Sequence, residues 1–245
     1  MINNGTAQLK SSVGKKIVTG VTGLGLFVFV VAHLVGNLTI FIGAEAFNAY
    51  AHFLESLLHG GFIYIAEAGL ILFFLSHIAA GIRIALGKKR ARPEGYAVVA
   101  SKGGPSRKTL SSRSMVITGA VILVFVVLHV KMFKYGPGES DGYIMAAHGQ
   151  EVRDLYRLVV EEFNKLDRVV LYVAAMLLLG LHLRHGFWSA FQSLGANNPR
   201  VMPFLYGAGL MFAVALAVGF LFIPVYIFFF IDPAEAASRL HGGGA

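Results

Sequence analysis

The chain has 245 residues, of which 56% are hydrophobic and 14% charged, and its mean hydropathy is +0.67. This composition excludes an ordinary soluble globular protein and predicts an integral membrane protein. The absence of cysteine excludes cysteine-ligated iron–sulfur clusters, thioether-linked haem and disulfides. A net charge of +8 would suggest a nucleic-acid partner for a soluble chain. In a membrane protein it is first a topology signal, so we expect no nucleic-acid partner.

Five apolar segments follow one another along the chain, each long enough to cross a lipid bilayer. They cover residues 17–42, 62–86, 114–133, 169–191 and 203–231. The first lacks a clear cleavage site and is longer than a signal-peptide core, so we interpret it as a retained span. The sequence shows no internal repeat and no low-complexity linker. It therefore predicts an all-α membrane protein with one transmembrane domain over residues 1–245.

Basic residues gather on one side of the predicted membrane. Three lysines precede the first span, nine lysines or arginines lie within residues 83–113, and Arg184 and Arg200 flank the turn between the last two spans. By the positive-inside rule, this side is cytoplasmic. The expected topology therefore has the N-terminus inside and the C-terminus outside.

Two outer connections carry amphipathic patterns. In residues 149–164 one helical stripe collects the apolar side chains Val152, Leu155, Tyr156, Val159 and Phe163. Residues 46–61 show a weaker pattern of the same kind, formed by Phe53, Leu54, Leu57 and Leu58. We expect both segments to be helices, and the first of them to lie across the outer mouth of the bundle.

Each of the first four spans contains one histidine deep in apolar sequence: His33, His77, His129 and His182. At 1.5 Å of rise per residue, His33 and His129 lie about 25 Å from the inner ends of their spans, near the outer face. His77 and His182 lie only about 9 Å from the inner ends. The histidines therefore form an outer and an inner layer, with two helices contributing to each.

Two imidazoles from facing helices are the axial ligands of a haem iron in many helical bundles. A single intramembrane histidine is equally well explained by a hydrogen bond between helices. Pairing by depth favours two haems b, the outer bound by His33 and His129 and the inner by His77 and His182. Iron with both axial positions filled suits electron transfer rather than oxygen chemistry.

Basic residues at the inner rim are candidate partners of the haem propionates: Lys15, Arg83 and Arg113. Ordinary anchoring of spanning helices at the lipid headgroups explains these residues equally well. Small residues on the four helices, such as Gly186 one turn after His182, would let a flat porphyrin approach the backbone. Close helix packing is the alternative explanation for these glycines.

Several stretches together resemble one known family. These are SSVGKK, TGLGLFVFVVAHLVGNL, NAYAHFLE, IRIALGKKRARP, DLYRLVVEEF and HLRHGFWSAFQSLG. Over nearly the whole chain the sequence is similar to the five-helix, two-haem cytochrome b membrane anchors of bacterial succinate:quinone oxidoreductases and fumarate reductases. The resemblance implies that the four histidines bind haem. Some anchors carry a glutamate for proton return two residues before the helix-four ligand, where this chain has Gly180, so that pathway is not expected.

The resemblance also implies partners and a location in the bacterial cytoplasmic membrane. A flavoprotein subunit and an iron–sulfur subunit are expected on the cytoplasmic face, and we expect the basic stretch from Arg83 to Arg113 to dock the iron–sulfur subunit. Menaquinone or another quinone is the implied electron acceptor. The alternatives are an anchor of a quinol:fumarate reductase, an anchor of a hydrogenase or formate dehydrogenase, and a transporter. The spans lack the paired acids and broken helices that a transporter would show.

The inner end of the fourth span offers groups suited to a quinone head group: Arg184, His185, Trp188 and Ser189. They supply a charge, an imidazole, an indole and a hydroxyl within about one turn of helix. A second possibility is an outer site near Glu67, a carboxylate early in the second span that would exchange protons with the outside. We favour the inner site, because electrons arrive from the cytoplasmic side.

Overall fold

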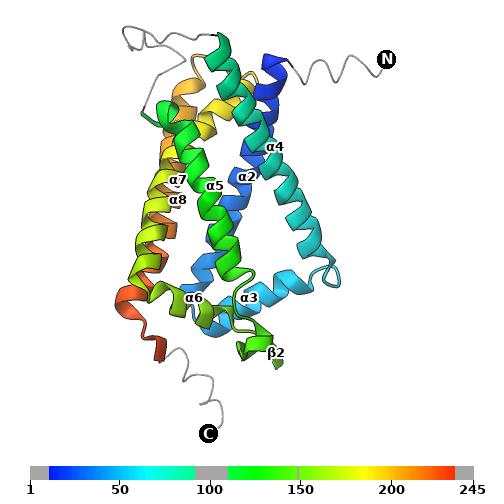
Figure 1. The fold of residues 1–245 in the computed structure, drawn as a ribbon, viewed down its shortest axis with the longest axis vertical. Coiled ribbons are helices and arrows are strands. Elements are labelled where there is room, and N and C mark those ends of the chain that lie inside the picture. The colour runs from blue at the N-terminus through cyan, green and yellow to red at the C-terminus, as the bar shows by residue number, and fades with distance from the viewer. Residues whose placement is uncertain (1–10, 92–109, 148, 235–245) are drawn as a thin grey trace. The chain divides into compact units, whose positions relative to one another are not determined.

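A computed structural model describes residues 11–91, 110–147 and 149–234 (Figure 1). Five helices in this part of the chain are long and apolar enough to cross a membrane. They are α2 (Ser12–Asn37), α4 (Gly61–Ala91), α5 (Leu110–Phe133), α7 (Leu166–Ser193) and α8 (Met202–Phe230). A short 3-10 helix, η1 (Leu38–Phe41), continues α2. The prediction of an all-α membrane protein with five spans is confirmed.

The long helices expose large apolar side chains that a soluble protein would bury. On α5, for example, Val116, Ile117 and Val124 are 64%, 69% and 61% exposed. A helix satisfies its own backbone hydrogen bonds, so such a surface is stable in contact with lipid acyl chains. The outward-facing residues of these helices therefore form a surface suited to lipid.

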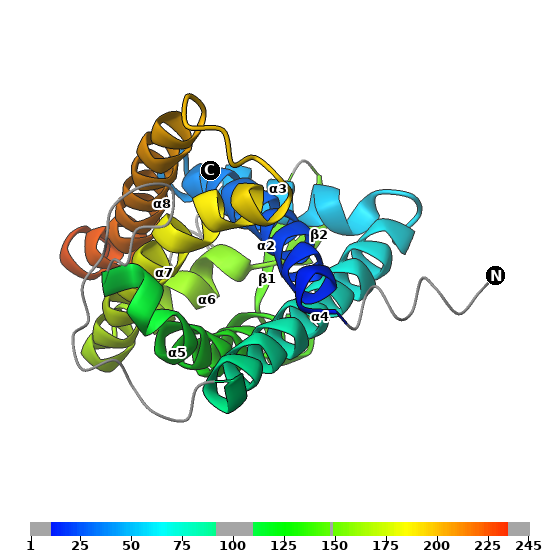
Figure 2. The same cartoon turned by 90° about the horizontal axis from the view of Figure 1, so that it is seen from above.

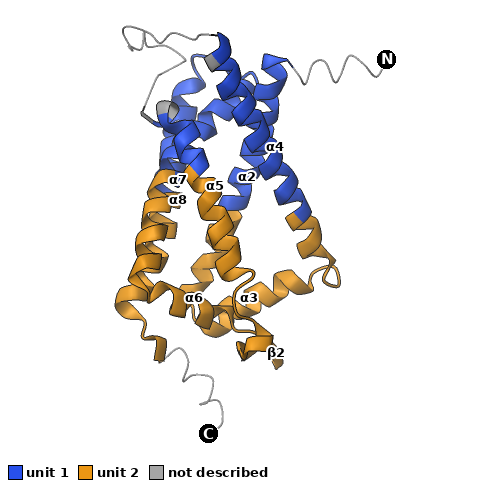
Figure 3. Ribbon diagram, viewed as in Figure 1, with its two compact units in different colours: residues 1–30, 68–120, 179–215 blue, residues 31–67, 121–178, 216–245 orange. Residues whose placement is uncertain are grey.

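The chain divides into two compact units (Figure 3). Unit 1 comprises residues 1–30, 68–120 and 179–215, and unit 2 comprises residues 31–67, 121–178 and 216–245. Each of the five long helices contributes one stretch to unit 1 and another to unit 2. The units are described separately below.

Unit 1 is held together by aromatic contacts and close helix approaches between α2, α7 and α8. Figure 2 shows these helices from above. The ring centroid of Phe27 lies 5.1 Å from that of Phe187 and 5.4 Å from that of Phe212. At Gly20 a methyl group would come within 3.2 Å of the Ala190 carbonyl oxygen. The glycine therefore lets α2 and α7 approach one another closely.

Unit 2 contains the connections between α2 and α4 and between α5 and α7, which form α3 (Ala44–Ser56), the 3-10 helix η2 (Glu139–Asp141), an antiparallel hairpin and α6 (Leu155–Phe163). Strand β1 (Ile144–Ala147) pairs with β2 (Gln150–Arg153), with Met145 opposite Val152. The expected helix over residues 149–164 is therefore wrong in its first part. Val152 is buried as predicted, but it lies in a strand, and the helix begins only after Asp154.

A buried polar cluster joins α3 to α6 within unit 2. Asn48 is fully buried, and its side-chain amide donates to Asp154 Oδ1 over 2.8 Å. The Asn48 side-chain oxygen, Oδ1, accepts from the Tyr156 backbone N–H, also at 2.8 Å. Asp154 caps α6 by accepting from the Arg157 N–H. Because every one of these groups is paired, the cluster fixes α3 against the start of α6.

The apolar pattern predicted for residues 46–61 does not form a buried stripe. Phe53 and Leu58 are 54% and 67% exposed, whereas the buried side chains of α3 are Phe47 and Asn48. The helix ends at Ser56, and Leu58 follows in a turn with a positive φ of 53°. The predicted helical spacing therefore ends before its last two leucines.

A second polar contact in unit 2 ties the hairpin region to α6. The Tyr143 hydroxyl donates to Glu161, and this hydrogen bond raises the pKa of Tyr143. The Arg157 guanidinium donates to the other Glu161 oxygen over 2.7 Å and lies over the Tyr143 ring. The residues just before β1 are thereby fixed to the solvent-facing side of α6.

Candidate functional site

The four intramembrane histidines meet as two pairs. In unit 2 the ring centroids of His33 on α2 and His129 on α5 are 5.8 Å apart. In unit 1 the centroids of His77 on α4 and His182 on α7 are 6.4 Å apart. The structure thus brings together the same two pairs that the depth argument groups into layers.

Threonine hydroxyls orient the rings of the unit 1 pair. Thr118 Oγ1 lies 3.1 Å from His182 Nδ1 and donates its own hydrogen to the Ser114 carbonyl. The threonine oxygen therefore accepts, and His182 Nδ1 carries the proton. For His182, this leaves Nε2 as the nitrogen with a free lone pair, the form that binds a metal.

His77 is oriented in the same way from α2. Its Nδ1 lies 3.3 Å from the Thr19 carbonyl oxygen and 3.4 Å from Thr22 Oγ1. A carbonyl oxygen only accepts, so Nδ1 of His77 is the protonated nitrogen. Both histidines of the pair therefore present Nε2 as the available ligand atom.

A glycine directly follows Thr22 and Thr118, and each of these two glycines makes room for an imidazole. A methyl group at Gly23 would lie 3.1 Å from His77 Cε1, and one at Gly119 would lie 3.4 Å from His182 Cε1. Each Thr-Gly step therefore supplies one hydrogen-bond acceptor and one open space to a histidine on the neighbouring helix.

The unit 2 pair is surrounded by aromatic rings. His129 Nδ1 lies 2.9 Å from the hydroxyl of Tyr172, which is only 6% exposed. The ring of Phe125 is stacked on His129 with centroids 5.8 Å apart. On the other side of the pair, Phe220 lies 5.9 Å from His33. Tyr172 therefore orients His129 as Thr118 orients His182, inside an apolar shell.

The geometry fits a haem at each pair. Metal–imidazole bonds of about 2 Å on both sides of one iron place the two ring centroids roughly 6 Å apart. The separations of 5.8 and 6.4 Å bracket this value. Among the described residues, no group of three or more His, Cys, Asp or Glu is placed to hold a metal ion. A metal at either pair therefore needs additional ligands from outside the protein, as the four porphyrin nitrogens provide.

The helical faces beside the unit 1 histidine pair leave space for a flat group such as a porphyrin. Gly81 and Gly186 each come one turn after a paired histidine, and a methyl group at either would meet no atom within 4 Å. Side chains at these positions would lie on the helical faces that carry His77 and His182. The glycines therefore keep these two faces open.

The residues predicted to contact a quinone at the inner end of α7 lie in different surroundings. Trp188 is 6% exposed and packs with Met202 and Leu205, whereas Arg184 is exposed and Ser189 half-buried. His185 contacts the Trp188 ring edge-on, with centroids 4.6 Å apart. His185 Nδ1 is buried and has no hydrogen-bond partner among the described residues.

At the alternative outer position, Glu67 is already paired. Its carboxylate accepts from the Lys134 ammonium group, which links α4 to the end of α5 within unit 2. The Glu67 side chain is 32% exposed. This carboxylate therefore has a permanent positive neighbour, which the sequence alone does not reveal.

The three candidate propionate partners are only partly described. Lys15 and Arg83 line one open pocket between α2 and α4 in unit 1. Arg113 belongs to α5, but its side chain lies outside the described residues. Of the expected docking loop, residues 92–109 are likewise outside the described part of the chain.

Sequence reasoning identified the histidines but missed the residues that orient them: Thr19, Thr22, Thr118 and Tyr172. Their spacing carries no periodic signal, because a contact between helices depends on how each helix is rotated. The Thr-Gly step, which occurs at Thr19, Thr22 and Thr118, is a local signal that could have identified the threonines.

No family model matches the chain, and no solved structure matches it. The succinate dehydrogenase cytochrome b558 subunit of Bacillus subtilis (strain 168) is 29% identical over 184 residues, which are 74% of this chain and 78% of that protein. This similarity extends over most of both proteins, as the sequence motifs predict. The predicted resemblance is therefore confirmed: the chain is similar to a protein named as the cytochrome b558 subunit of a succinate dehydrogenase.

Proposed function

We propose that the chain is the membrane-spanning cytochrome b subunit of a succinate:quinone oxidoreductase. It holds two haems b and conducts electrons from an iron–sulfur subunit to a quinone. The observation that supports this most strongly is the presence of two histidine pairs with ring separations of 5.8 and 6.4 Å inside apolar helices. The similarity to a succinate dehydrogenase subunit supports the choice of enzyme complex.

When bound, haem supplies a reversible one-electron couple, and the protein supplies the ligands and their surroundings. His33 and His129 bind one iron, and His77 and His182 bind the other. The Thr19 carbonyl holds His77, and the Thr118 hydroxyl holds His182, in the tautomer that leaves Nε2 available, while Tyr172 orients the His129 ring through its Nδ1. An iron held by two protein imidazoles would change oxidation state without exchanging a ligand, which suits electron transfer.

Soluble partners complete the enzyme. A flavoprotein subunit carries succinate oxidation and an iron–sulfur subunit docks on the cytoplasmic face, next to the inner ends of α2 and α4. Exposed cations at the end of α4, including Lys88 and Arg90, suit an acidic docking surface. Identification of the subunits that co-purify with the chain separates this proposal from a hydrogenase or formate dehydrogenase anchor.

The quinone, menaquinone in the first instance, binds at the inner end of α7. The unpaired Nδ1 of His185 supports this position, because a buried polar atom without a partner is costly unless a ligand completes it. At the outer position, the Glu67 carboxylate already has Lys134 as its partner. The inner site is therefore the stronger candidate.

Haem content tests the proposal directly. The complex purified through this chain should give about two haems b per chain by the pyridine haemochrome assay, because there are two histidine pairs. Replacing His182 by alanine should remove one haem, whereas the same change at His52, which contacts Gln150 in the outer connections, should remove none. A haem content near zero in the unsubstituted protein rejects the proposal.

Two substitutions test the quinone position. His185→Leu should lower quinone reduction, because the His185 ring forms a hydrogen bond with the quinone. Haem content should stay at the unsubstituted level, because His185 does not bind iron. Glu67→Gln should leave turnover within about twofold if quinone binds only at the inner site. The opposite result, with turnover lost only in Glu67→Gln, places the quinone at the outer end.

A further inference from the structure

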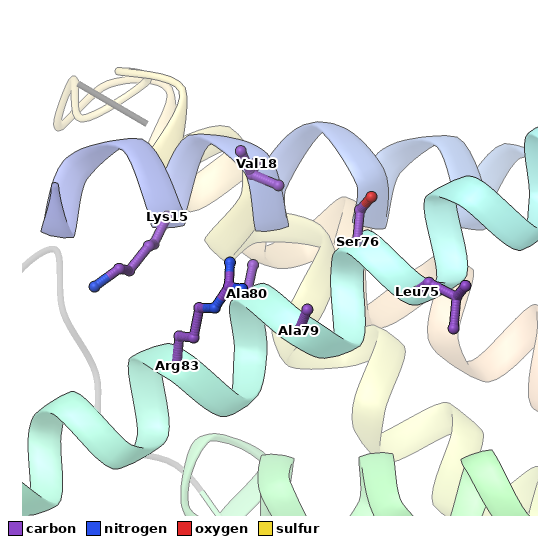
Figure 4. A pocket seen from close by; sticks show the side chains of 7 residues that line it. All are labelled: Lys15, Val18, Leu75, Ser76, Ala79, Ala80 and Arg83. Atoms are coloured by element: carbon purple, nitrogen blue, oxygen red, sulfur yellow. The ribbon is translucent and has the colours of Figure 1, made fainter. Parts of the chain in front are cut away.

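An open pocket lies between the inner ends of α2 and α4 in unit 1 (Figure 4). It has a volume of about 310 Å³ and is lined by Lys15 and Val18 from α2 and by Leu75, Ser76, Ala79, Ala80 and Arg83 from α4. One wall therefore carries an ammonium group, and the other a guanidinium and a hydroxyl. Three groups that can donate hydrogen bonds surround a pocket without any acidic residue in its lining.

The charge of this pocket is not balanced within its own unit. The described residues of unit 1 contain no aspartate and no glutamate. Neither Lys15 nor Arg83 has an ion pair or side-chain hydrogen bond in the described part of the chain. Two cations this near the ends of membrane spans attract an anion from outside the unit.

The pocket and the histidine pair adjoin on α2. His77 contacts α2 at Thr22, Thr19 and Gly23. At about 100° per residue, Thr19 and Gly23 are turned to one side of Thr22 by about 60° and 100°. In the pocket wall, Lys15 is turned to the same side by about 20°, and Val18 to the other side by about 40°. The pocket therefore begins beside the surface of α2 that meets His77.

On α4 the pocket extends away from His77. Phe73, which packs against Gly25 of α2, is turned from His77 by about 40°. In the pocket lining, Ala80, Ser76 and Arg83 are turned further in that direction, by about 60°, 100° and 120°. Leu75 lies almost opposite His77, at about 160°. The pocket therefore opens toward the flank of α4 that faces away from His77.

The far rim of the pocket is apolar and exposed. Leu75 lines the pocket and is 61% exposed, and Leu72 and Ile82, on the same face of α4, are 63% and 53% exposed. These side chains form a lipid-facing stripe directed away from His77. A ligand of this pocket therefore has an anionic group for the two cations and long apolar chains for the stripe.

We propose that the pocket between Lys15, Ser76 and Arg83 binds the phosphate of an acidic glycerophospholipid, whose acyl chains lie along Leu72 and Leu75. Basic pockets between spanning helices at the cytoplasmic surface suit acidic lipid headgroups. A zwitterionic lipid would bring its own ammonium group toward two uncompensated cations. The inference does not depend on haem binding or on the identity of the partner subunits.

Native mass spectrometry of the complex purified through the full chain tests this site. The complex is stripped of lipid in mild detergent and titrated with phosphatidylglycerol or with phosphatidylcholine. The double variant Lys15→Gln with Arg83→Gln should bind phosphatidylglycerol roughly thirtyfold more weakly, as expected for the loss of two basic residues near a lipid phosphate. Phosphatidylcholine binding should change little.

A matched control removes two positive charges near the pocket but outside its lining. Lys88→Gln with Arg90→Gln changes two positions at the same end of α4, outside the pocket lining, and should retain phosphatidylglycerol. The charge-conserving pair Lys15→Arg with Arg83→Lys should also retain the lipid, which shows that the effect is not misfolding. Equal weakening in pocket and control variants overturns the proposal in favour of a general surface attraction.

Two further arms distinguish other sources of the anion. Inorganic phosphate at tens of millimolar should not displace phosphatidylglycerol, and displacement would identify a free-phosphate site instead. Haem content should be the same in the double glutamine variant and the control. Loss of one haem with unchanged lipid binding would assign Lys15 and Arg83 to propionates and reject the lipid site.

Discussion

Single side chains decide which histidine nitrogen is available. Thr118 is 2% exposed, and its hydroxyl is placed between the Ser114 carbonyl and the His182 ring. The ring of a metal-binding histidine is commonly fixed in this way by a hydrogen bond from its second nitrogen. The threonine therefore determines a property of His182 that no distance between histidines reveals.

Thr118→Val keeps the shape of the side chain and removes the acceptor. The buried N–H of His182 is then left without a partner, at a cost of about 1–3 kcal/mol. We expect haem affinity at the unit 1 pair to fall roughly tenfold or more, as is typical when such a partner is lost. Haem titration of the stripped protein measures this. Thr118→Ser should retain affinity, and Thr39→Val, whose hydroxyl contacts only a backbone carbonyl, should be neutral.

Alanine should have different effects at Gly23 and Gly119, the two glycines that contact the unit 1 histidines. At Gly23 a methyl group would be compressed against His77 at 3.1 Å, whereas at Gly119 it would be in ordinary contact with His182 at 3.4 Å. Gly23→Ala should therefore displace His77 and lower haem content at this pair, and Gly119→Ala should have the smaller effect. Gly207→Ala, where a methyl group meets nothing within 4 Å, is the control. Equal haem loss in all three variants would contradict the steric explanation.

At the scale of elements, the five spans follow from composition, because about 20 consecutive apolar residues are needed to cross a bilayer and few other structures use them. The hairpin does not follow in the same way. Its strands have four residues each, and Val152 fits the apolar stripe of the following helix equally well. The buried contact between Asn48 and Asp154 decides the boundary, and it joins residues more than 100 positions apart.

Asn48→Ala tests that contact. It leaves the Tyr156 N–H without its acceptor and Asp154 without one donor, and each buried unpaired group costs about 1–3 kcal/mol. We expect faster hydrogen exchange at Tyr156 and through the start of α6, while haem content is retained. Asn197→Ala, at an exposed position after α7, should leave exchange in α6 unchanged. Unchanged exchange in Asn48→Ala would show that the hairpin is held by other contacts.

Across the whole molecule, charge and histidines are both divided between the two units. Every aspartate and glutamate among the described residues belongs to unit 2. This division agrees with the cytoplasmic placement of the basic side, which stays a prediction. Depth along a helix was predictable because the rise per residue is fixed, so the sequence sufficed to pair the histidines. Helix rotation is set by packing, so Tyr172 and the threonines were not predictable.

Each histidine pair lies within one unit, and this predicts how combined substitutions behave. His33→Ala with His129→Ala should lose the same single haem as either change alone, because one missing axial ligand already weakens that site. His33→Ala with His77→Ala should lose both haems. Effects within a shared site are not additive, whereas effects at independent sites add. Haem content and the absorption spectrum of the remaining haem distinguish these patterns. Retention of one haem when His33 and His77 are both changed would mean that they bind the same iron, and the pairing would be wrong.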